Sequence, residues 1–147
     1  MNNENIIEIK GLKKSYENGT IKALNGVDLE IKKGESVSII GPSGSGKSTL
    51  LDMIGALDKA DEGSIHVDGF DLMQNEDFSE FRLNKIGFVF QSFFLLPRLN
   101  AIQNVMLPLF YRGTPKAEAK EKLRCDRPVG ANRTVGGLAP VLTERWM

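Results

Sequence analysis

The stretch that decides the fold is Gly41-Pro42-Ser43-Gly44-Ser45-Gly46-Lys47-Ser48. Its glycines let the backbone curl with several N–H groups pointing inward, at φ values that a Cβ atom would oppose. The apolar run Ser36–Ile40 precedes it and is typical of a strand buried on both faces. A helical pattern follows it, with one apolar face formed by Leu50, Leu51, Ile54 and Leu57. The N-terminus of that helix would direct unsatisfied N–H groups and a positive dipole end at the loop, so we predict a phosphate-binding loop.

The same eight residues match the Walker A pattern of nucleotide-binding proteins in full. In that pattern Lys47 reaches the β- and γ-phosphates as a mobile point charge, and the Ser48 hydroxyl ligates Mg²⁺. The remaining residues of the predicted phosphate cradle are Gly41, Ser43, Gly44, Ser45 and Gly46. We therefore predict a site for a nucleoside triphosphate with its magnesium ion.

Outward from this loop, clusters of β-branched residues predict further strands. The strands are expected at residues 6–9, 27–31, 64–67 and 86–90. The turn signal Glu17-Asn18-Gly19-Thr20 lies between the first two strands, so we expect the N-terminal segment to form an antiparallel sheet.

Two helices are expected in the later part of the chain. Asn100 is a suitable N-cap for a helix that begins at Ala101, and Pro108 should end or kink that helix. Thr114-Pro115 predicts the start of a second helix, which extends to Leu123. The whole pattern predicts an α/β fold with an antiparallel β-subdomain at its N-terminal side.

Composition narrows the class of protein. The chain has 147 residues, 19 basic and 19 acidic side chains, and one cysteine. A net charge near zero gives no electrostatic reason to expect nucleic acid as a partner, and a single cysteine excludes a disulfide framework. The apolar stretches are far shorter than the ~20 residues that span a bilayer, and the polar N-terminus does not match a signal peptide. We expect a cytoplasmic protein.

The residues around the loop resemble one family. Tyr16 ends the first strand region, Gln91 follows the apolar strand at residues 86–90, and an apolar loop comes next. Together with the Walker A stretch, these residues resemble the nucleotide-binding subunit of an ABC transporter. The run from Ile86 to Gly113 resembles most the branch that serves lipoprotein release, macrolide efflux and antimicrobial-peptide export. The fold that this resemblance implies is a P-loop ATPase core, incomplete at its C-terminal side.

The resemblance also implies roles for individual residues. Tyr16 corresponds to the aromatic residue that stacks on adenine, and Thr49 to a residue that bonds the α-phosphate. Gln91 corresponds to a glutamine that touches Mg²⁺ or the attacking water, so it joins Lys47 as a candidate catalytic residue and Ser48 as a candidate metal ligand.

The resemblance further implies the cofactors ATP and Mg²⁺ and two partners. The partners are a transmembrane permease subunit and a second ATPase subunit, with the chain on the inner face of the cell membrane. The loop that contains Phe93, Phe94 and Leu95 would face the permease, although simple core packing is equally consistent with these residues.

Several residues that this family needs for hydrolysis have no counterpart here. No second apolar strand ends in an Asp-Glu pair, and no Leu-Ser-Gly-Gly-Gln signature is present. Residues 1–123 therefore match the front part of such an ATPase, and we expect weak ATP binding without turnover. An ATPase of a non-transport membrane complex, for example in cell division, and a non-catalytic nucleotide-binding module are the alternatives.

The composition changes abruptly near Arg124. Every lysine lies in residues 1–123, whereas residues 124–147 contain arginine as their only basic residue. The only Cys and the only Trp also lie in this tail. We hypothesise that residues 124–147 are a frameshifted or non-native tail.

The coding DNA tests this hypothesis. If a simple frameshift produced the tail, translation beyond codon 123 in one of the other two frames should give a signature loop. Absence of that loop from both frames would exclude a simple frameshift.

Overall fold

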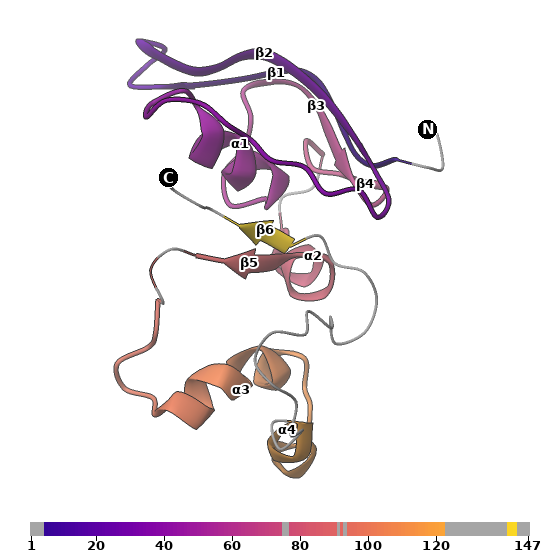
Figure 1. Ribbon diagram of the computed structural model, residues 1–147, viewed down its shortest axis with the longest axis vertical. Helices are drawn as coiled ribbons and strands as arrows, with labels where there is room; N and C mark the ends of the chain where they lie inside the picture. Colours follow the sequence, from indigo (N-terminus) through magenta and orange to yellow (C-terminus); the bar gives the residue numbers. More distant parts are fainter. Residues whose placement is uncertain (1–4, 75–76, 91, 93, 123–140, 144–147) are drawn as a thin grey trace. The chain divides into compact units, whose positions relative to one another are not determined.

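The computed structural model describes residues 5–74, 77–90, 92, 94–122 and 141–143 (Figure 1). These residues fall into two units that divide between Arg82 and Leu83, and each unit is described by itself.

The first unit begins with a long antiparallel hairpin. Strand β1 (Asn5–Tyr16) pairs with β2 (Ile21–Lys32), and the connecting turn contains Gly19 at φ 92°. Backbone hydrogen bonds close the turn from Gly19 N to Tyr16 O and from Thr20 N to Glu17 O, at 3.2 Å each. The predicted turn and antiparallel sheet are confirmed, and both strands are longer than their apolar clusters indicated.

The hairpin extends into a four-stranded sheet of order β2-β1-β3-β4. Strand β3 (Glu62–Val67) pairs antiparallel with β1, and β4 (Phe70–Asp71) completes the edge. Helix α1 (Lys47–Ile54) lies against β2 and β3. The core between sheet and helix contains Ile7, Ile9, Leu12, Leu50, Met53, Ile54, Ile65 and Val67, all buried. The expected apolar face of α1 is present except at Leu57, which lies beyond the end of the helix and is 48% exposed.

The prediction of a buried strand at Ser36–Ile40 is wrong for this structure. These residues have no regular secondary structure, and the Ile40 side chain is 87% exposed. A strand of this kind lies inside a sheet and pairs with neighbouring strands. None of the described strands pairs with this segment. The segment is apolar, but the strands that would pair with it and bury it are not among the described residues.

The second unit contains two helices and a short parallel strand pair. Strand β5 (Gly87–Val89) pairs with β6 (Val141–Thr143), which confirms a strand at the predicted position. Helix α2 (Ser79–Lys85), which the sequence pattern did not predict, extends across the division between the units.

Helix α3 (Ala101–Tyr111) begins at the predicted N-cap with a full capping box. The Asn100 side chain accepts from Gln103 N, and Gln103 Oε1 accepts from Asn100 N, both at 2.9 Å. Pro108 does not end the helix, because α3 continues through it to Tyr111, and a kink at Pro108 stays a prediction. Proline has no N–H and so removes one backbone hydrogen bond, and it stands close to the end of the helix.

Helix α4 (Lys116–Lys122) follows Thr114-Pro115, as predicted. The predicted boundary between residues 123 and 124 lies outside the described residues. Within the part of the chain that the structure describes, no helix is long and apolar enough to cross a membrane.

The core predicts a clear difference between two isoleucines of the hairpin. Ile9→Ala should lower the free energy of unfolding by roughly 2–5 kcal/mol, because Ile9 is completely buried between sheet and helix. Ile21→Ala is the matched control, since Ile21 is 48% exposed and its truncation should cost much less. Urea denaturation of the full chain measures both, and equal losses would contradict this placement of the core.

Candidate phosphate-binding site

The loop before α1 is shaped by Gly44 and Gly46. Both have left-handed backbone conformations, with φ 76° and 74°. At Gly46 a side chain is excluded by space as well, because a Cβ atom would lie 2.1 Å from the Ala23 carbonyl oxygen of β2. Glycine at this position therefore lets the loop approach the sheet closely before the helix begins at Lys47.

The first turn of α1 is suited to an anion. Gly46 is the N-cap residue and provides no side-chain hydrogen bond to the helix. The N–H groups of a helix's first turn have no partners within the helix, and they carry the positive end of its dipole. Ser43, Gly44 and Ser45 are exposed in the loop that leads to this helix end. The donor set fits a phosphate group, which needs several N–H donors and a positive potential.

The ammonium group of Lys47 lies at the start of the loop. Its Nζ atom donates to the carbonyl oxygens of Gly41 and Pro42, at 3.1 Å each. The side chain is partly exposed, as are those of Ser48 and Thr49 in the same turn of α1. The structure therefore brings an ammonium group and two hydroxyl groups to one end of the helix, within a loop of glycine and serine.

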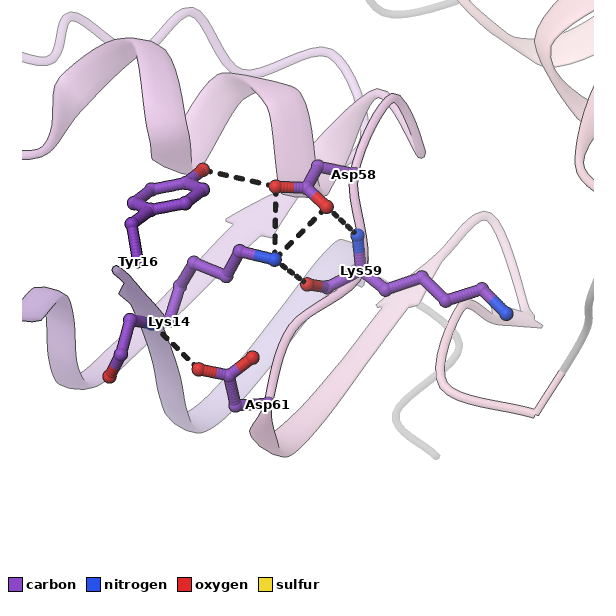
Figure 2. Close-up of polar contacts among 6 residues, drawn as sticks. Lys14, Tyr16, Asp58, Lys59 and Asp61 are labelled. Atoms are coloured by element: carbon purple, nitrogen blue, oxygen red, sulfur yellow. Dashed lines mark hydrogen bonds and ion pairs between the residues drawn. The ribbon is translucent and has the colours of Figure 1, made fainter. Parts of the chain in front are cut away.

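Tyr16 joins this site from the end of β1. Its phenol donates to Asp58 Oδ2 at 3.0 Å (Figure 2). The Thr49 side chain lies close to the same hydroxyl group. Partial burial raises the pKa of the phenol, and the hydrogen bond to the Asp58 carboxylate raises it further. The Tyr16 side chain remains 38% exposed. Two predicted site residues that are far apart in the sequence, Tyr16 and Thr49, thus lie near each other.

Sequence reasoning missed Asp58 and Lys14. The Lys14 side chain is almost completely buried, and its Nζ atom lies 3.0 Å from both carboxylate oxygens of Asp58. It also donates to the Lys59 carbonyl oxygen at 2.6 Å. The spacing of Lys14 and Tyr16 could have indicated Lys14. Residues two apart in a strand share one face of the sheet, so Lys14 is expected on the same face as Tyr16.

The surroundings of Asp58 favour its charged form. Partial burial alone raises the pKa of the carboxyl group, but hydrogen bonds from Lys14, the Lys59 backbone and Tyr16 outweigh it. The net result is a pKa below the ordinary value for aspartate.

Gln91 and Phe93 lie outside the described residues, so their predicted roles stay predictions. Their apolar neighbours are open to solvent, with Phe94 71% exposed and Leu95 62% exposed. The Phe94 ring contacts Phe90 edge-on, with 5.0 Å between ring centroids. In this unit the loop is therefore not buried as part of a core.

The lowered pKa of Asp58 predicts how stability depends on pH. A carboxylate whose pKa is lowered by folding stabilises the folded state above the unfolded pKa of about 3.9, and this contribution is lost as the pH falls through the lower folded value. Asp58→Asn should therefore lose less stability than the unaltered chain between about pH 4.5 and pH 2.5. Urea denaturation across this range measures the difference, and parallel curves would contradict the pairing with Lys14.

Comparison with known proteins identifies the family. The family model described as ABC transporter matches residues 24–136. The lipoprotein-releasing system ATP-binding protein LolD of Bacteroides thetaiotaomicron is 47% identical, over 80% of this chain and 54% of its own length. The macrolide export ATP-binding/permease protein MacB of Bdellovibrio bacteriovorus is 47% identical, over 72% of this chain and 17% of its own length.

A solved structure agrees with this assignment. It is the ATP-binding cassette MJ0796, a protein of Methanocaldococcus jannaschii, as a dimer in a post-hydrolysis state bound to ADP and Pi. Its TM-score is 0.73 at 44% identity, covering 79% of this chain and 53% of the solved one. The chain spans about half the length of the first relatives it matches. With its glycine loop, its helix N-terminus and these likenesses, the chain belongs to the ABC transporter family.

Proposed function

We propose that this chain binds ATP with Mg²⁺ through the loop at residues 41–48. The observation that carries the proposal is the close approach of Gly46 to Ala23, which places the uncapped N-terminus of α1 behind a glycine-rich loop. The helix N-terminus and the loop N–H groups would hold the β- and γ-phosphates. Lys47, which already lies across this loop, would neutralise phosphate charge.

Tyr16 and Thr49 would extend the site toward the base. Thr49 would bond the α-phosphate, and the exposed part of the Tyr16 ring would stack on adenine. Stacking of a nucleobase on an aromatic side chain contributes ~1–3 kcal/mol where it has been measured in nucleic-acid complexes. The proximity of the two side chains supports this assignment, because it places the base end and the phosphate end of the site next to each other.

Ser48 would ligate the magnesium ion. Mg²⁺ prefers oxygen ligands and retains several waters, so one hydroxyl group with phosphate oxygens is a sufficient set. The ion would neutralise charge on the β- and γ-phosphates. Gln91 is the further candidate ligand, as the family resemblance implies.

The partners we propose are a transmembrane permease and a second ATPase subunit. The chain would lie at the cytoplasmic face of the membrane and couple nucleotide binding to export. Two observations support this proposal: the names of its relatives concern lipoprotein release and macrolide export, and the solved neighbour is a dimer. The exposed apolar loop that contains Phe94 and Leu95 would contact the permease.

Nucleotide titration of the full chain tests the site. Lys47→Ala should weaken binding of Mg²⁺–ATP at least tenfold, because it removes the ammonium group from the loop. Lys33→Ala is the control, since this exposed lysine lies in the turn after β2, away from the loop. Unchanged affinity in the Lys47→Ala chain would overturn the assignment.

Phosphate release measured on the same samples addresses hydrolysis. The 147 residues contain no Asp-Glu pair after an apolar strand and no signature loop, so ATP should bind without turnover. Turnover above background that Lys47→Ala abolishes would contradict this expectation.

A further inference from the structure

The segment after α1 is fastened to the end of β1. Asp61 N donates to the Lys13 carbonyl oxygen at 2.9 Å, and Asp61 Oδ2 accepts from Ser15 N at 2.6 Å. Figure 2 shows Asp58, Lys59 and Asp61 next to the part of β1 that carries Lys14 and Tyr16. These bonds fix the backbone of β1 relative to the segment after α1. The side chains of the two segments that contact each other therefore extend from fixed backbone positions.

The Tyr16 side chain is held at both of its ends. Its Cα atom belongs to β1, and its hydroxyl group donates a hydrogen bond to Asp58. A tyrosine ring with a free hydroxyl can rotate about two side-chain bonds, and binding of a stacked base would then have to order it. The hydrogen bond to Asp58 restricts that rotation before any ligand arrives.

Lys14 in turn holds the Asp58 carboxylate. Its buried ammonium group lies 3.0 Å from both carboxylate oxygens and 2.6 Å from the Lys59 carbonyl oxygen, so its donors point at one short segment. The same ammonium group lies over the Tyr16 ring, 5.1 Å from its centroid. One face of the ring is thus covered by the cation, and the Tyr16 side chain stays 38% exposed.

We propose that Asp58 is a positioning residue for the Tyr16 ring, with Lys14 holding its carboxylate. The proposal rests on the proposed function, because it assumes that a nucleobase stacks on Tyr16. Its consequence is specific: the network strengthens binding of a nucleotide that has a base and does nothing for a bare polyphosphate.

Binding of two ligands by three variants distinguishes positioning of the Tyr16 ring from a contribution of these residues to folding alone. The ligands are Mg²⁺–ATP and Mg²⁺–tripolyphosphate, which lacks ribose and base. The variants of the full chain are Tyr16→Phe, Asp58→Ala and the chain that combines both. Tyr16→Phe keeps the ring and removes a single oxygen, so folding should be retained even if Asp58→Ala, which leaves Lys14 without its carboxylate, is destabilised.

Tyr16→Phe should weaken binding of ATP about fivefold, which corresponds to ~1 kcal/mol, and leave binding of tripolyphosphate unchanged. Asp58→Ala should have the same selective effect, and the combined chain should bind ATP no more weakly than either single variant. Tyr16→Ala should weaken ATP binding further, because it removes the ring as well. Glu62→Ala is the control: it removes an exposed carboxylate that pairs with Lys13 and does not contact the ring, and it should leave both affinities unchanged.

The outcomes distinguish two kinds of failure. If Lys47→Ala weakens binding of both ligands but Tyr16→Phe leaves the ATP affinity unchanged, the positioning role is wrong and the phosphate site stands. Equal losses for ATP and tripolyphosphate in the Tyr16→Phe chain would also overturn the positioning role, because they indicate damage to the phosphate loop. If the unaltered chain binds neither ligand, the proposed function fails and this inference fails with it.

Discussion

The contact between Gly46 and the Ala23 carbonyl is the constraint on which the site depends. The loop can reach the helix only by passing so close to β2 that no side chain fits, and it must do so at a positive φ angle. Any other residue would push the loop from the sheet and move the first turn of α1 with it. The position of the phosphate-binding N–H groups is therefore set by the sheet, through one glycine.

The sheet also determines where the other half of the site lies. β1 pairs with β2, so the strand that ends at Tyr16 is a neighbour of the strand that supports Gly46. Helix α1 leads back through Asp58 and Asp61 to the end of β1. Loop, helix and strand form a closed path of contacts inside one unit, and this path brings the segment after α1 to the end of β1.

The features that could be predicted from the sequence depend on residues close together in the chain. The turn at Gly19, the N-cap at Asn100 and the glycine-rich loop before α1 each depend on a few consecutive side chains, and the structure has all three at the predicted positions. The strand expected at residues 36–40 failed for the opposite reason. Its apolar side chains predict burial, but the strands and helices that would bury them are formed by residues distant in sequence. The bond between Tyr16 and Asp58 was missed on the same ground, since 42 residues separate them.

This distinction also explains why so much of the proposed site lies in a chain that spans about half the length of its relatives. In the proposed site, phosphate recognition would use backbone N–H groups, one lysine and two hydroxyl groups, and all of them come from the loop and the first turn of α1. Base recognition would add the end of the adjacent hairpin. Transfer of the γ-phosphate to water needs, in addition, a group that orients the attacking water on the far side of the phosphate from the loop. The loop and helix would approach the phosphates from one side, so that group would have to come from another part of the fold.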